Sequence, residues 1–169
     1  MRVRKSGLPP VVDENTEILI LGTLPSETSL AIGQYYANPS NDFWILVGAA
    51  LSQTFEGWLY EAKMEVLKGS RIGLWDAYCS CVRPGSMDKD ISEKEPNDFS
   101  ILKKLAPNIG LICFNGQGAA EAKKSLVLLG YQTRLLPSSS GANRKDQEGR
   151  LICWKAALGS DQRSGGRRS

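Results

Sequence analysis

The run Glu17–Leu21, which reads EILIL and is closed by Gly22, is the stretch that indicates the fold class. Its isoleucine and leucine side chains are typical of a strand buried inside a sheet, and the glycine marks the tight turn that ends it. Leu111–Phe114 (LICF) has the same character and also runs into an Asn-Gly turn. Further strands are expected at Arg71–Trp75 (RIGLW) and Thr133–Leu136 (TRLL).

Apolar residues repeat at helical spacing in the intervals between these strands. Phe43, Val47 and Leu51, for example, fall on one side of a helix. Gly130 follows a similar pattern at the point where a helix commonly stops. Helices are therefore predicted over residues 41–51, 96–105, 117–129 and 150–158.

Strands that alternate with helices predict an α/β fold. We expect a single-domain three-layer sandwich, with a mostly parallel central sheet and helices on both faces. The length of 169 residues, with 41% hydrophobic and 23% charged residues, fits one folded domain. We expect this domain to span residues 1–160 and the basic, Gly/Ser-rich residues 161–169 to form a disordered tail.

The composition excludes several kinds of chemistry. The chain has no histidine, so it has neither a Ser-His-Asp or Cys-His nucleophile nor a His-ligated zinc site. Its four cysteines do not form a Cys-x-x-Cys pair, which favours reduced thiols in the core over a metal site. We therefore expect no metal and no cofactor. The chain has neither a secretory signal nor an apolar run of ~18 residues, which predicts a cytoplasmic protein without a membrane span.

Three polar loops follow the predicted strands, and they read GTLPS (22–26), NGQG (115–118) and PSSSGANR (137–144). The carboxyl ends of parallel strands meet at one edge of a sheet, where ligands bind. Backbone amides in these loops can contact a phosphate or a base. The segment 22–44 has no apolar periodicity of its own and is expected to be a functional loop. Its tyrosines and asparagines are suited to stacking a planar base and hydrogen-bonding its edge.

Taken together, these motifs resemble the uracil-DNA glycosylase superfamily, and more narrowly its DNA-deoxyinosine, or hypoxanthine-DNA, glycosylase branch. The resemblance covers about residues 17–158. Four motifs in the same order carry it: GTLPS at 22–26, QYYANPSNDFW at 34–44, FNG at 114–116 and LPSSSGAN at 136–143. Gly73, Trp75 and Asp76 also match the second strand of that branch.

The resemblance implies a monofunctional enzyme that hydrolyses the N-glycosidic bond of a deaminated base, preferably hypoxanthine, flipped out of DNA. It implies DNA as the partner, and we expect a monomer. Asn41 is the candidate that activates or positions the attacking water, and Asn115 is expected near the base edge or the water. The candidate substrate-binding residues are Gly22, Thr23, Leu24, Pro25, Tyr36 and Phe114. The candidate DNA-binding residues are Pro137, Ser138, Ser139, Ser140, Gly141, Ala142, Asn143 and Arg144.

Alternatives remain open at this point. The mismatch-specific branch has an asparagine where this chain has Leu24, which disfavours a uracil or mismatch glycosylase without excluding it. A domain of the same fold that binds nucleic acid without catalysis is a third possibility. Asp42 and Asp76 are alternative water activators, although Asp76 is expected rather to cap or brace a loop. Asn41 has a plain structural use as a helix cap, and Trp44 is expected to lie in the core.

Overall fold

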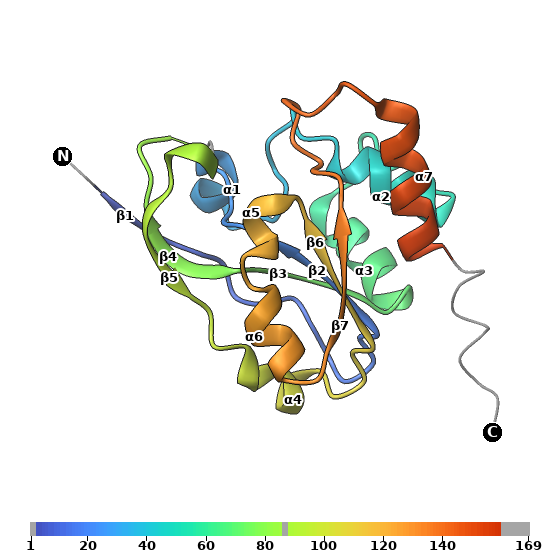
Figure 1. The fold of residues 1–169 in the computed structure, drawn as a ribbon. Helices are drawn as coiled ribbons and strands as arrows, with labels where there is room; N and C mark the ends of the chain where they lie inside the picture. The colour runs from blue at the N-terminus through green and yellow to red at the C-terminus, as the bar shows by residue number, and fades with distance from the viewer. Residues whose placement is uncertain (1–2, 86–87, 160–169) are drawn as a thin grey trace.

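The computed structural model describes residues 3–85 and 88–159, so the predicted tail at 161–169 lies outside the described residues (Figure 1). Its central sheet has four parallel strands in the order β3-β2-β6-β7. The strands are β2 (Ile18–Gly22), β3 (Ile72–Asp76), β6 (Leu111–Asn115) and β7 (Gln132–Leu136). Each lies within a residue of its predicted position. Because all four run the same way, their carboxyl ends form one edge.

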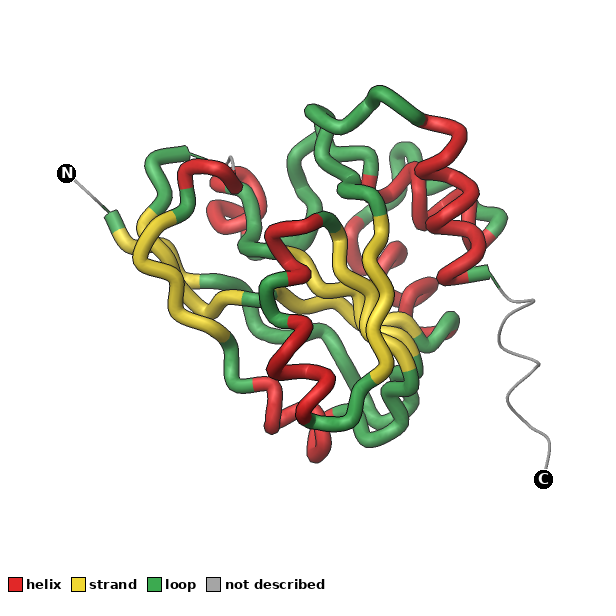
Figure 2. The backbone as a smooth tube through the Cα atoms, viewed as in Figure 1, coloured by secondary structure: helices red, strands yellow, loops and turns green. Residues whose placement is uncertain are grey.

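The two faces of the sheet are both covered by helices (Figure 2). Alternate residues of β2 divide between two apolar clusters: Leu19 and Leu21 lie in one, and Ile18 and Ile20 lie in the other. This alternation follows from the pleat of a strand. The first cluster includes residues from α4 (Leu102–Leu105), α5 (Gln117–Ala120) and α6 (Lys123–Leu128). The second includes residues from α2 (Phe43–Leu51), α3 (Tyr60–Gly69) and α7 (Gln147–Leu158). The expected three-layer α/β fold is confirmed.

A second, antiparallel sheet was not predicted. It has three strands in the order β1-β4-β5, namely β1 (Arg4–Ser6), β4 (Tyr78–Val82) and β5 (Ser92–Pro96). Every residue of β5 is exposed, and its sequence SEKEP has none of the apolar character that marks the central strands. An edge strand of this kind gives no hydrophobic signal.

Several predicted segments differ from the structure; the helix expected over 150–158, for example, is α7 and begins at Gln147. The helix expected over 96–105 begins only at η2 (Phe99–Ile101), because Pro96 ends β5 and Asp98 caps the turn by accepting a hydrogen bond from the Ser100 N–H at 3.0 Å. The helix expected over 117–129 is divided into α5 and α6. The segment 22–44, expected to be a loop throughout, contains α1 (Glu27–Ile32), which is capped by Ser26.

The cysteines agree in part with expectation. All four thiols are free, and Cys81 and Cys113 are buried in the core, where burial raises the pKa of Cys113 to about 12. Cys153 is exposed on α7, so it is not a core thiol. Within residues 3–85 and 88–159, no three Cys, Asp or Glu side chains gather as metal ligands. No helix in the described part of the chain has the length and apolar character needed to cross a membrane.

Candidate functional site

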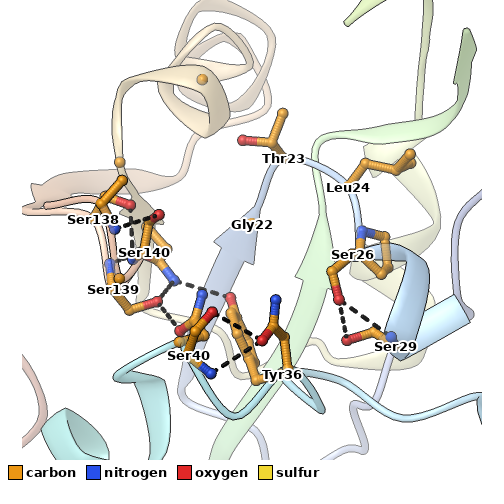
Figure 3. A pocket seen from close by; sticks show the side chains of 18 of the residues that line it. Gly22, Thr23, Leu24, Ser26, Ser29, Tyr36, Ser40, Ser138, Ser139 and Ser140 are labelled. Carbon is orange, nitrogen blue, oxygen red and sulfur yellow. Dashed lines mark hydrogen bonds between the residues drawn. The ribbon is translucent and has the colours of Figure 1, made fainter. Parts of the chain in front are cut away.

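A pocket of about 500 Å³ lies at the carboxyl edge of the parallel sheet (Figure 3). The loops that follow β2, β6 and β7 contribute to its wall, together with the segment between α1 and α2. Figure 3 shows Ser138–Ser140 on one side, Thr23 and Leu24 on the other, and Tyr36 near its base. Thirteen of the predicted site residues line it: Gly22, Thr23, Leu24, Pro25, Tyr36, Asn41, Asn115, Ser138, Ser139, Ser140, Gly141, Ala142 and Arg144.

Three predicted site residues do not line this pocket. Phe114 is 1% exposed and packs in the core with Leu21, because its side chain points to the opposite face of β6 from its neighbours. The Pro137 carbonyl accepts a hydrogen bond from the Trp154 indole of α7 at 2.9 Å. Asn143 turns back and donates to the Ser138 carbonyl at 3.1 Å.

Gly22, at the end of β2, allows two side chains to close over the strand. A Cβ at this position would lie 2.6 Å from Asp76 Oδ1 and 3.2 Å from the Tyr36 hydroxyl. The first distance is impossible without movement of the carboxylate. Asp76 is 3% exposed and lines the pocket beside this glycine. The absence of a side chain at Gly22 therefore sets how closely Asp76 and Tyr36 approach the sheet edge.

Asn41 lies at the start of α2 and is held by its side-chain oxygen. Asn41 Oδ1 accepts hydrogen bonds from the Phe43 N–H at 2.9 Å and from Ser139 Oγ at 2.8 Å. The first bond forms an Asx turn that leads into α2, whose N-cap is Asp42, and the second joins the segment before α2 to the loop after β7. Asn41 therefore lines the pocket and precedes the N-cap of α2, which is Asp42, so it is not itself the helix cap.

Asn115 ends β6 and is 9% exposed. Its Nδ2 donates to the Tyr36 hydroxyl at 3.1 Å and to Ser139 Oγ at 2.8 Å, and its Oδ1 accepts from the Ser139 N–H at 2.8 Å. Both ends of this amide therefore hold neighbouring segments in place. Ser139, which is 1% exposed, contacts both candidate catalytic amides.

Tyr36 has a supported ring. It stacks on Phe43 with 3.6 Å between ring centroids and 5° between ring planes, and Trp44 Nε1 donates to the Tyr36 carbonyl at 3.2 Å. Its backbone φ of 54° lies in the left-handed region that a bulky residue seldom adopts. The backbone strain and the stacking together fix the orientation of this ring at the pocket wall.

Asp42 is 6% exposed and forms ion pairs with two arginines. Its oxygens accept hydrogen bonds from Arg144 Nε at 2.9 Å and Nη2 at 2.8 Å, and from Arg150 Nη2 at 2.6 Å. The hydrogen bond from Arg144, aided by Arg150, lowers the pKa of the Asp42 carboxyl below its ordinary value. Asp42 is therefore an anchor for two cations, and its suggested alternative role as a water activator is not supported.

Two buried arginines that the sequence did not single out hold the pocket loops. Arg150, 3% exposed, donates to the carbonyls of Ser138 and Ser140, both at 3.3 Å, and to that of Asn143. Arg83, 1% exposed, donates to the backbone carbonyls of the loop after β2. The detectable signal for Arg150 was a charged residue at the start of an otherwise apolar helix pattern. Arg83 gave no signal.

The loop after β7 also depends on a close backbone approach. A Cβ on Gly141 would lie 2.3 Å from the Ser40 carbonyl oxygen, and the Asp42 N–H donates to the Ser139 carbonyl at 2.9 Å. Gly141 thus allows the loop to lie directly against the segment that carries Asn41. The two strips of chain form one continuous wall.

Comparison with known proteins places these features in a family. Residues 9–158 match the model of the uracil DNA glycosylase superfamily. A protein of Methanosarcina acetivorans described as a hypoxanthine DNA glycosylase is 52% identical over 91% of this chain and 98% of its own length. One from Methanosarcina barkeri with the same description is 46% identical over 92% of this chain and 99% of its own.

More distant and structural matches agree with this placement. A G/U mismatch-specific uracil DNA glycosylase of Schizosaccharomyces pombe is 29% identical over 68% of this chain and 36% of its own length. The solution NMR structure of a candidate uracil DNA glycosylase from M. acetivorans superimposes with a TM-score of 0.84 at 51% identity, covering 92% of this chain and 97% of that one.

Proposed function

The chain belongs to the uracil DNA glycosylase superfamily, and from this premise we propose that it is a DNA repair enzyme that removes hypoxanthine from DNA. The observation that carries the proposal is the pocket in which Asn41, Asn115 and Tyr36 converge at the sheet edge. The Methanosarcina proteins described as hypoxanthine DNA glycosylases, which match more than nine-tenths of the chain, support hypoxanthine as the preferred base.

The reaction suits a pocket of amides. As the water oxygen bonds to C1′, the C1′–N9 bond breaks and its electron pair leaves with the base, while the sugar passes through an oxocarbenium-like state. Hypoxanthine spreads the negative charge over O6 and N1, so neutral hydrogen-bond donors are able to stabilise its departure. The proton lost by the water ends on the base or in solvent. In this scheme Asn41 positions the water and the stacked Tyr36 ring contacts the extruded base.

The loop after β7 supplies the contact with DNA. Ser138, Ser140 and Gly141 line the pocket and present hydroxyl and amide groups suited to phosphate oxygens. Arg144 forms an ion pair with Asp42, so in this proposal it holds the conformation of the loop as well as attracting DNA. We propose that the protein acts as a monomer, which light scattering of the purified protein tests.

The test uses duplexes that carry a single inosine, uracil or xanthine, with abasic sites detected by alkaline strand cleavage. We expect the inosine duplex to react fastest and borohydride to trap no covalent adduct. Preferential cleavage of uracil opposite guanine would instead support the mismatch-specific alternative. Cleavage of none of the three would support a binding domain without catalysis.

The first variant to test is Asn41→Ala. We expect it to release no measurable hypoxanthine while it still binds the inosine duplex, because the remaining contacts of the loop after β7 stay in place. Anisotropy with a labelled duplex measures the binding. Turnover retained in this variant would refute the role of Asn41.

A further inference from the structure

The polar groups of the pocket form a hydrogen-bond network whose direction is set by two backbone N–H groups. A backbone N–H can only donate, so the Asn41 atom that contacts the Phe43 N–H must be its oxygen. By the same reasoning, the Asn115 atom that contacts the Ser139 N–H must also be its oxygen. The orientation of both amides thus follows from chemistry, with no ambiguity between oxygen and nitrogen.

The hydroxyl of Ser139 then has one possible arrangement. Asn115 turns its Nδ2 toward Ser139 Oγ at 2.8 Å, so Ser139 accepts there. The single hydroxyl proton of Ser139 is left to donate to Asn41 Oδ1, also at 2.8 Å. Hydrogen bonds therefore run in one direction, from Asn115 through Ser139 to Asn41.

This direction decides which atom of Asn41 serves the pocket. Its oxygen accepts from both the Phe43 N–H and Ser139 Oγ, which uses the two lone pairs of an amide oxygen. The Nδ2 group, with two protons, is the part left to meet a ligand. Asn41 lines the pocket and is half-buried, so this group is within reach of a bound nucleoside.

We infer that Ser139 is a positioning residue that holds Asn41 as a hydrogen-bond donor, so that Asn41 binds the oxygen of the attacking water and does not accept its proton. The inference rests on the proposed function and specifies the chemistry of the same site. Burial of Ser139 at 1% exposure excludes direct contact with bulk solvent and fits a supporting role.

The first experiment compares Ser139→Ala with Ser80→Ala. Ser80 is a matched control, since it is 7% exposed and its Oγ also makes two hydrogen bonds, with Arg4 and Glu95, but in the antiparallel sheet. We expect Ser139→Ala to lower kcat on the inosine duplex roughly 10- to 100-fold with little change in KM, because a misplaced amide costs about this much. An equal loss in both variants, or wild-type kcat in Ser139→Ala, would overturn the inference.

The second experiment separates the donor from the acceptor role. Asn41→Asp replaces the Nδ2 donor with an acceptor oxygen, and we expect it to be as inactive as Asn41→Ala. Substantial turnover in Asn41→Asp would contradict the inference.

The third measurement does not depend on activity. In 15N-labelled protein, the side-chain amide signals of Asn41, assigned by their absence in Asn41→Ala, should shift or broaden in Ser139→Ala. The control is the side-chain amide of Asn108, which does not line the pocket and donates a hydrogen bond to the Glu14 carbonyl at 2.7 Å. Its signals should not change. Unaltered Asn41 signals would refute the positioning role of Ser139, whichever base the wild-type protein removes. The proposed function is tested separately, by the activity of the wild-type protein on the inosine duplex.

Discussion

Asp42 follows Asn41 in the chain, and its carboxylate joins the start of α2 to Arg144 in the loop after β7 and to Arg150 in α7. The two arginines differ in environment: the Arg144 side chain is 47% exposed, and the Arg150 side chain is 4% exposed. Their contributions should differ accordingly, because water screens an exposed ion pair and a buried charge that loses its partner is left uncompensated.

We therefore expect Arg150→Met to lower the free energy of unfolding by about 3 kcal/mol. Arg144→Met, which removes the exposed partner, should lower it by about 1 kcal/mol or less. Urea unfolding of both variants measures the difference. Equal losses would show that the buried arginine has no special role in holding the loop carbonyls.

The ion pairs of Asp42 also predict a pH dependence. Its folded-state pKa is lowered, first by the Arg144 hydrogen bond, so the stability that it contributes is present above the unfolded pKa of about 3.9 and is lost as pH falls through the folded pKa. Asp42→Asn should thus be less stable than the wild type at pH 7, and the difference should shrink below about pH 4. Thermal unfolding at pH 7, 4 and 2.5 measures this. A difference that stays constant across this range would contradict the assignment.

At the scale of elements, the sheet edge is built by loops that need close contact. The Gly141 position shows this most clearly, since an added Cβ would meet the Ser40 backbone oxygen at 2.3 Å. A Cβ added to Gly110, just before β6, would have no atom within 4 Å, and the φ of Gly110 is not positive. The two glycines are a matched pair for the same substitution.

Gly141→Ala is expected to push the loop after β7 away from the segment that carries Asn41. Overpacking of this kind costs about 1 to 3 kcal/mol, and inosine-duplex binding should weaken as well. Gly110→Ala should leave the free energy of unfolding and the affinity for the inosine duplex nearly unchanged. Urea unfolding and anisotropy measure the two effects, and a Gly141→Ala protein that matches the wild type in both would show that the loop tolerates separation.

The central strands could be predicted because continuous apolar runs such as Glu17–Leu21 have few other uses in a small domain. β5 could not, because its exposed polar residues resemble a loop. The network around Ser139 was also beyond the sequence: Ser139 was placed in the correct loop, but its bond to Asn41 spans 98 positions. The ion pair between Asp42 and Arg150 joins residues that are 108 positions apart in the sequence. Contacts at such separations are decided by how the strands pair, which local patterns do not specify.

At the scale of the whole molecule, the parallel sheet brings distant parts of the chain to one edge. The loops of the pocket follow β2, β6 and β7, which lie side by side although about 90 residues separate the first from the second, Ile18 pairing with Leu111. The formal net charge of +3 is mild, and Asp42 offsets part of the positive charge near the pocket. Attraction to DNA should therefore depend on a few phosphate contacts.

The link from Arg150 back to Asp42 has a consequence for synthesis on the ribosome. During translation, the segments that carry Asn41 and Asn115 leave the exit tunnel before α7, whose Arg150 holds the loop after β7. A growing chain therefore lacks the contacts that Arg150 makes with Asp42 and with the loop carbonyls until α7 has emerged.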